Sequence, residues 1–253
     1  MSVLVKQEGE TVRITLSRPE RRNALAEDML HDLLDALEEI GRSDATGIVL
    51  AAEGPVFSSG HDFADVHGRD HASSRDLLQL CTSVMRAVQT TPQVVIARVQ
   101  GLATAAGCQL VASCDLAVAA ESAGFALPGG KAGWFCHTPA VAVARTISRK
   151  HLMEMALTGD VVDAKTAAEW GLVNYTVPDD ELDAAVEQLL ARATRGSRSS
   201  KALGKQTLRA QLDRPEDDAY TLAIEVMAAA SQTVDAVEGR DAFLEKRRPV
   251  WQS

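Results

Sequence analysis

The amino-acid sequence predicts an α/β protein with a largely parallel sheet. Short strand-like runs alternate with longer runs in which apolar residues recur at helical spacing. One short run, residues 47–52, is apolar throughout, which is typical of a strand covered on both faces of a parallel sheet. The chain has 253 residues, 46% of them hydrophobic and 24% charged. These values indicate one or two globular units.

The first half of the chain begins the alternation of strand-like and helix-like runs. Residues 12–16 alternate apolar and polar side chains, as a strand does, and residues 24–40 place their leucines on one helical stripe. The strand at 47–52 ends at a Gly-Pro pair. We expect a loop from residue 56 to about residue 73, followed by a helix over residues 74–89.

The second half continues the pattern and then becomes helical. We expect a strand over residues 92–99, a helix over 105–113 and a strand over 115–119. After residue 138 the pattern is mainly helical, with one strand over 172–177. Residues 192–201 are polar and basic. The sequence therefore predicts an α/β core over residues 1–195 that holds the functional site, and a helical region over residues 196–253.

Composition and charge exclude several classes of protein. The 35 acidic residues outnumber the 26 basic ones, giving a net charge of −9, which disfavours nucleic-acid binding. No apolar stretch approaches the length of about 20 residues that a membrane helix needs. The N-terminus lacks the pattern of a signal or transit peptide, so we expect a cytoplasmic protein. The four cysteines show no Cys-x-x-Cys pair and are interpreted as buried thiols.

Common catalytic motifs are missing. The sequence contains no Gly-x-Ser-x-Gly elbow, no phosphate-binding loop ending in Gly-Lys-Ser/Thr and no Gly-x-Gly-x-x-Gly fingerprint. Histidines and aspartates gather within residues 61–71, but their spacing matches no zinc pattern. We interpret this cluster as a solvated loop and predict no metal site.

Two segments of small residues form a more specific pattern. Residues 57–63 follow the strand at 47–52, and residues 100–109 follow the strand at 92–99 and open a helix. Small side chains let a ligand approach the main chain, and a helix N-terminus adds unpaired N–H donors. Tight packing explains either segment alone. Together they indicate two donors that converge on one carbonyl oxygen, which is an oxyanion hole.

These two segments, in this order and separation, resemble the crotonase (enoyl-CoA hydratase/isomerase) superfamily. The resemblance extends to residues 16–25, 114–117, 153–160 and 167–173, and to the terminal run 246–251, and so covers nearly the whole chain. It implies a crotonase-like spiral of ββα units with a C-terminal helical trimerisation region. It also implies a homo-trimer or a hexamer built as a dimer of trimers, and an acyl-CoA thioester as ligand. Coenzyme A enters as part of the substrate, and no other cofactor is implied.

The resemblance also assigns positions in the site. The backbone N–H groups of His61 and Ala106 are implied as the oxyanion donors. The positions implied to bind substrate are Ala24, Ser59, Gly60, Asp62, Phe63, Ala105, Gly107 and Pro128. The family often has glycine where Ala105 and Ala106 stand. Alanine keeps the amide and is harmless at these positions if both residues have negative φ.

Departures from the family pattern concern acid–base chemistry. The two glutamates of family hydratases fall at Gln109, whose amide cannot take a proton near neutral pH, and at Gly129. General acid–base groups contribute about 10²–10⁴-fold each, so efficient hydration is disfavoured. His137 matches the position of a catalytic carboxylate in some relatives and is a candidate acid or base, or else a structural residue. Weaker candidates are Lys131, Cys136 and Asp62, and a capping role is favoured for Asp62.

Three functions are consistent with these residues. The first is an enoyl-CoA hydratase-like enzyme, of lyase or isomerase type, in fatty-acid or acyl-CoA metabolism. The second is a protein that binds acyl-CoA, or modulates partner enzymes, without turnover. The third is a different crotonase reaction that uses His137 and a water held by Gln109. The basic residues of 192–201 and 246–248 either meet coenzyme A phosphates, across a subunit boundary, or are solvated charge near helix ends.

Overall fold

Two sheets run through the body of the protein in the computed structural model, which describes residues 2–252. The first sheet has the order β1 (Val3–Glu8), β2 (Thr11–Leu16), β3 (Gly47–Ala52), β5 (Val94–Val99), β7 (Leu116–Ala120) and β10 (Tyr175–Val177). Only the β1–β2 pairing is antiparallel, and β2, β3, β5, β7 and β10 pair in parallel. The predicted α/β class with a largely parallel sheet is confirmed.

The second sheet is made of shorter strands. Its order is β4 (Val56–Ser58), β6 (Leu102–Thr104), β8 (Gly124–Ala126) and β9 (Val162–Asp163), and only β8 and β9 pair antiparallel. A strand of the first sheet is followed directly by a strand of the second and then by helix. This unit occurs three times along the chain, beginning at β3, β5 and β7. The repetition winds the chain into a spiral of strand–strand–helix units.

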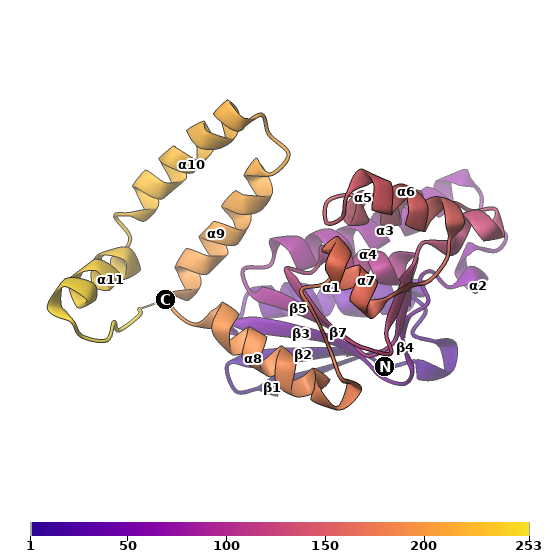
Figure 1. The fold of residues 1–253 in the computed structure, drawn as a ribbon, viewed down its shortest axis with the longest axis horizontal. Helices are drawn as coiled ribbons and strands as arrows, with labels where there is room; N and C mark the ends of the chain where they lie inside the picture. Colours follow the sequence, from indigo (N-terminus) through magenta and orange to yellow (C-terminus); the bar gives the residue numbers. More distant parts are fainter. Residues whose placement is uncertain (1, 253) are drawn as a thin grey trace.

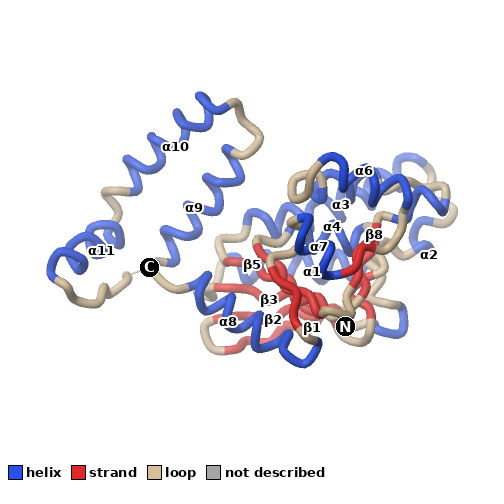
Figure 2. Tube along the Cα trace, viewed as in Figure 1, coloured by secondary structure: helices blue, strands red, loops and turns tan. Residues whose placement is uncertain are grey.

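Helices cover both sheets (Figure 2). Those of the body are α1 (Glu27–Gly41), α2 (Phe63–Val66), α3 (His71–Thr90), α4 (Ala106–Ser113), α5 (His137–Val143), α6 (Arg149–Thr158), α7 (Ala164–Trp170) and α8 (Leu182–Thr194). Short 3₁₀ turns occupy η1 (Pro19–Arg21), η2 (Pro128–Ala132) and η3 (Asp179–Glu181).

Strand β3, inside the first sheet, is buried on both faces, which explains its continuous apolar run. Val49 and Ile96 pack on one face against α8, through Val186 and Leu190 among others. The opposite face belongs to the main core, which it shares with α1, α3 and α4. An alternating polar pattern in β3 would have placed polar groups in one of these interfaces at a cost in stability.

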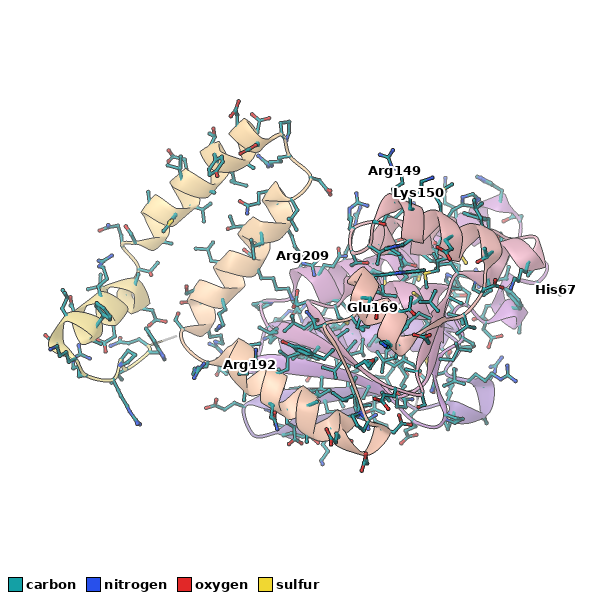
Figure 3. The ribbon with its side chains drawn as sticks, viewed as in Figure 1. His67, Arg149, Lys150, Glu169, Arg192 and Arg209 are labelled. Atoms are coloured by element: carbon teal, nitrogen blue, oxygen red, sulfur yellow. The ribbon has the colours of Figure 1, made fainter. Side chains whose placement is uncertain are left out.

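Three helices leave the body as an arm: α9 (Arg198–Gln211), α10 (Glu216–Ala230) and α11 (Val234–Glu245). Figure 1 shows α10 and α11, in yellow, standing clear of the sheets. Asp115 fixes the base of the arm, because its carboxylate pairs with Lys205 at 2.7 Å and with Arg209 at 3.0 Å. Arg209 is labelled in Figure 3, on the side of α9 nearest the body. Burial lowers the pKa of Lys205, and the neighbouring Asp115 carboxylate opposes that shift.

Two local predictions are wrong. The expected loop over residues 56–73 contains β4, α2 and the start of α3. Asp62 and Asp70 begin α2 and α3 by accepting hydrogen bonds from the backbone N–H groups of Ala64 and Ser73, so polar residues that suggested a loop are helix caps. The strand expected over 172–177 covers only β10, because residues 172 and 173 turn into the core after α7.

The boundary expected at residue 195 falls between α8 and α9, which end and begin at residues 194 and 198. The functional division into a core and a trimerisation region stays a prediction.

Candidate functional site

Close packing of small residues brings the turns after β4 and β6 together. Gly107, in the first turn of α4, lies against β4, and a Cβ added to it would stand 2.4 Å from the Ser58 carbonyl oxygen. Gly60 has φ +85°, and a Cβ added there would stand 3.1 Å from the Ala106 amide nitrogen. A side chain at either glycine would push the two turns apart. The sequence-predicted segments therefore meet at one place.

Each of the two turns presents an unpaired backbone donor. Within residues 2–252, neither the His61 N–H nor the Ala106 N–H has a protein acceptor. Ala106 is the first residue of α4, where N–H groups lack helical partners and the helix dipole is positive. Two such donors, one from each turn, are able to bind a single carbonyl oxygen and to stabilise negative charge on it.

The first turn is held in place by the buried Asn23. Its side-chain amide donates to the carbonyl oxygens of Glu53 and Val56, each at 2.8 Å, and its Oδ1 accepts from the Arg18 N–H at 2.8 Å. The Asn23 carbonyl oxygen accepts from the Ser58 hydroxyl, also at 2.8 Å. Asn23 has φ +48°, a conformation that asparagine tolerates better than most residues. The segment that precedes α1 is thus tied to both ends of β4.

His61 and Ala106 both line a cavity of about 650 Å³. Ten of the residues that the sequence analysis assigned to the site line this cavity: Ala24, Ser59, His61, Asp62, Phe63, Ala105, Ala106, Pro128, Gly129 and His137. Three assigned residues, Gly60, Gly107 and Gln109, are not among its lining residues. Gly60 and Gly107 lie at the contact between the turns, where they allow the close approach described above.

Other lining residues were not predicted. They are Arg21, Arg22, Leu78, Ala132, Trp134, Phe135, Thr138 and Pro139. The arginines belong to a segment that carries the family resemblance, and the adjacent Trp134 and Phe135 are a rare aromatic pair in a chain with 4% aromatic residues. Those two signals were available in the sequence. Leu78 reaches the cavity from α3 and is identified only by tertiary packing.

Gly129 cannot carry a side chain in this backbone. A Cβ added to it would stand 2.2 Å from the Trp134 carbonyl oxygen and 2.9 Å from the Cys136 sulfur. The Gly129 N–H donates to that sulfur at 3.3 Å. The turn that follows η2 therefore fills the space in which a glutamate side chain would begin.

Gln109 is also poorly placed for acid–base chemistry. It is 4% exposed on α4, and its Oε1 has no hydrogen-bond partner among the described residues. An amide in that position neither takes a proton nor gives one near neutral pH. The two positions to which the resemblance assigned the glutamates thus present no acid–base group to this cavity.

The remaining candidates have visible structural partners or are exposed. Asp62 caps α2 and pairs with Arg21, as its capping interpretation predicted. Lys131 pairs with Asp160 at 2.6 Å. Burial raises the pKa of the Cys136 thiol, which disfavours the reactive thiolate. The His137 side chain is exposed at the start of α5, with its ring 5.1 Å from that of Phe135.

The His61 side chain differs from these groups. Both of its ring nitrogens are buried, and neither has a hydrogen-bond partner within residues 2–252. Burial lowers the pKa of this imidazole, and the nearby Asp65 carboxylate opposes the shift. The ring of Trp134 lies 6.0 Å from the His61 ring, measured between centroids.

The acidic and histidine cluster of residues 61–71 does not converge. In the part of the chain that the structure describes, no three His, Cys, Asp or Glu side chains are placed to hold a metal ion. Asp65 instead accepts from the Glu27 N–H at 2.7 Å, and Asp70 caps α3. Cys81, Cys108 and Cys136 are buried free thiols, as predicted, and Cys114 is half-buried.

The basic segments lie away from the cavity in the described single chain. Arg198 pairs with Asp44 at 3.0 Å, and Arg247 pairs with Glu238 at 2.6 Å. Neither segment contributes a lining residue. No helix among residues 2–252 is long and apolar enough to cross a membrane.

Ala105 does not have the negative φ that would make alanine harmless at this position. It has φ +49° and ψ −118°, whereas Ala106 is helical. Its N–H donates to the Ala126 carbonyl oxygen at 2.9 Å, and its own carbonyl oxygen accepts from the Gln109 N–H at 3.0 Å. These bonds hold the backbone in a conformation that favours glycine, so the Ala105 Cβ is strained.

Comparison with known proteins gives consistent matches over the whole chain. The family model described as enoyl-CoA hydratase/isomerase matches residues 6–253. The mouse mitochondrial enoyl-CoA hydratase domain-containing protein 3 is 44% identical, over 97% of this chain and 83% of the relative. A crystal structure of enoyl-CoA hydratase from Mycobacterium smegmatis superposes with a TM-score of 0.97 at 41% identity, covering 100% of both chains. The human enoyl-CoA hydratase domain-containing protein 3 superposes with a TM-score of 0.96 at 40% identity, over 99% of this chain and 100% of that one.

The expectation of a cytoplasmic protein is contradicted by these relatives. The mouse, rat and human proteins are named as mitochondrial. The expectation rested on N-terminal composition alone, and the names of these similar proteins point to mitochondria instead.

Replacing Ala105 with glycine should stabilise the fold. Relief of the strained φ returns about 1–3 kcal/mol, and the greater chain entropy of glycine costs about 0.5–1 kcal/mol. We expect a net gain of about 1 kcal/mol in the free energy of unfolding, seen as a rise in Tm of about 2–4 °C at fixed protein concentration.

Ala112 provides the control, because it lies inside α4, the helix that Ala105 precedes. Ala112→Gly should lower the free energy of unfolding by about 1 kcal/mol. A loss of stability in both variants would show that Ala105 is not strained.

Proposed function

The chain belongs to the enoyl-CoA hydratase/isomerase family, and on that premise we propose that it binds an acyl-CoA thioester in the cavity between the His61 and Ala106 turns. The observation that carries this proposal is that His61 and Ala106 both line one cavity and that, within residues 2–252, their N–H groups have no protein acceptor. A thioester carbonyl oxygen is the acceptor that such a pair fits, and no cofactor beyond the coenzyme A of the ligand is needed.

The cavity suits the rest of such a ligand. Its wall contains apolar side chains, among them Leu78, Trp134 and Phe135, which favour burial of an acyl chain. Arg22 also lines it, and its positive charge would favour an anionic ligand. These features support a site in acyl-CoA or fatty-acid metabolism.

The chemistry proposed is polarisation of the thioester, which favours an enolate or an oxyanion. Two N–H donors lower the energy of negative charge that develops on the carbonyl oxygen. Hydration by two glutamates is not supported, because Gln109 and Gly129 supply no acid–base side chain. His137 remains a candidate proton carrier for a different reaction of the family. The packing at Gly129 favours the alternative of binding without turnover.

The arm supports assembly with further copies of the chain. In the described chain no residue of α10 is buried, and Tyr220, Ile224 and Met227 form an apolar stripe at spacings of four and three residues. Met227 is 78% exposed. An exposed stripe of this kind normally marks an interface. A homo-trimer, or a hexamer made of two trimers, would bury it.

A pair of ligands tests the site directly. Butyryl-CoA has the thioester carbonyl, and S-butyl-CoA is the thioether that lacks it. Two hydrogen bonds to the oxygen should make the thioester bind about 10-fold more tightly or better, measured by calorimetry. Crotonyl-CoA hydration, followed by absorbance, should be about 10⁴-fold or more slower than in a two-glutamate hydratase.

Equal affinities for the two ligands would contradict the oxyanion hole, and binding of neither would contradict the whole proposal. Rapid hydration would show that another group replaces both glutamates. Gly129→Glu is not a simple way to restore hydration, since its side chain requires the turn at Trp134 to move.

Assembly is tested by the mass in solution, measured by light scattering. We expect three or six times the 27.0 kDa of the chain. Ile224→Lys/Met227→Lys places two charges in the apolar stripe and should yield smaller species. Glu225→Lys, on the same helix but off the stripe, should keep the parent mass. A double variant that also keeps the parent mass would exclude α10 from the interface.

A further inference from the structure

Strand β1 lies at one end of the first sheet, and its outer edge is open. Its register with β2 sets Ser2 beside Ser17, whose N–H donates to the Ser2 carbonyl oxygen at 2.9 Å. In an antiparallel pair, residues bonded to the partner strand alternate with residues whose backbone groups point away from it. Val3, Val5 and Gln7 therefore direct their N–H and C=O groups to the open edge, where no hydrogen-bond partner among residues 2–252 meets them.

A groove of about 460 Å³ lies beside this edge, between β1 and α1. The three residues of β1 that face the open edge also line the groove. Helix α1 follows the strand in the same direction. Near one end the Ser2 hydroxyl donates to the Asp32 carboxylate at 2.5 Å, and beyond the other end the Thr46 N–H donates to the Glu10 carbonyl oxygen at 2.8 Å. An extended segment added to the edge would place every second side chain in this groove.

The wall that α1 contributes to the groove is acidic. Asp32, Asp35 and Glu39 line it, and none of the lining residues is basic. Asp35 and Glu39 are exposed, and their carboxylates have no hydrogen-bond or ion-pair partner among residues 2–252. These two residues are about 6 Å apart along the helix axis. Alternate residues of a strand are about 6.7 Å apart. Basic side chains at every second position of an extended segment would therefore meet both carboxylates.

The floor of the groove is apolar and also suits long basic side chains. Val5 is 52% exposed, and Val12, Ala36 and Ile40 line the groove beside it. Lysine and arginine cover apolar surface with their aliphatic stems while the charged ends stay in water. A basic side chain lying across Val5 would bury apolar surface and reach the acidic wall at the same time.

We propose that β1 and α1 together form a docking site for an extended segment of another protein that carries lysine or arginine at every second position. The segment adds a strand to the open edge of the first sheet. Main-chain hydrogen bonds give such a complex its affinity, and the alternate side chains give it specificity. Complementary charge favours this partner over an acidic one. The site is separate from the thioester cavity, because neither Asp35 nor Glu39 lines that cavity.

A synthetic peptide tests the spacing of the charges. The alternating peptide is Thr-Arg-Thr-Arg-Thr-Arg-Thr, acetylated and amidated, and calorimetry on the full-length protein measures its dissociation constant. The control peptide Arg-Thr-Thr-Arg-Thr-Thr-Arg has the same composition, but its neighbouring arginines lie on opposite faces of a strand. It should bind about 5-fold or more weakly. Failure of the wild-type protein to bind the alternating peptide would refute the docking site and leave the proposed function untouched.

Methylation of the peptide nitrogens tests the backbone pairing. The N–H groups of an extended peptide point alternately to its two edges, and only one edge meets β1. Methyl groups on the arginine nitrogens block one edge, and methyl groups on the threonine nitrogens block the other. One methylated peptide should bind about 10-fold or more weakly than the alternating peptide, and the other should stay within about 2-fold. Equal affinities of the two methylated peptides would contradict strand addition.

Variants of the protein test the acidic wall. Asp35→Asn/Glu39→Gln should weaken binding of the alternating peptide about 5-fold. Glu38→Gln/Glu187→Gln removes the same charge from exposed positions outside the groove and should keep the affinity within about 2-fold. Equal affinities of the two double variants would refute the role of the groove. Both should keep the wild-type mass in light scattering. A lower mass for Asp35→Asn/Glu39→Gln alone would assign the edge to a contact between copies of this chain and overturn the proposal.

Discussion

The close contact between the first turn of α4 and the end of β4 is the constraint on which the site depends. Gly107 lies against Ser58, and Gly60 lies beside the Ala106 amide, with no room for a side chain at either glycine. Because both contacts involve main-chain atoms, they fix the two free N–H donors relative to each other without help from any flexible group. Asn23 then holds the first of the two turns against the sheets.

The two donors of this site belong to the backbone and not to the side chains at positions 61 and 106. The donors persist whatever residues stand at 61 and 106, provided that the turns keep their geometry. Acid–base chemistry, in contrast, depends on which side chain stands at a position. At Gln109 the proton-transferring group is absent, and at Gly129 the Trp134 carbonyl oxygen occupies the space that a side chain would need. Under the proposed function, the backbone would polarise a carbonyl oxygen, while positions 109 and 129 supply no side chain that moves protons.

Much of this arrangement follows from sequence patterns. The continuous apolar run of β3 and the small residues after β4 and β6 predicted a covered parallel sheet and a pair of exposed amides. The resemblance supplied the spiral, which hydrophobic periodicity alone does not give. Short elements were missed where capping aspartates resembled loop residues, as at Asp62 and Asp70. The strain at Ala105 and the unpaired ring of His61 depend on φ and on tertiary burial, which no local pattern encodes.

The most direct measurement is the infrared spectrum of the thioester carbonyl in the bound ligand, isolated by a carbon isotope label in butyryl-CoA. Two N–H donors at the oxygen weaken the carbonyl double bond. The stretch should therefore shift to a clearly lower frequency than in water. A stretch at or above its frequency in water would mean that the His61 and Ala106 amides do not hold the oxygen, and would contradict this account of the site.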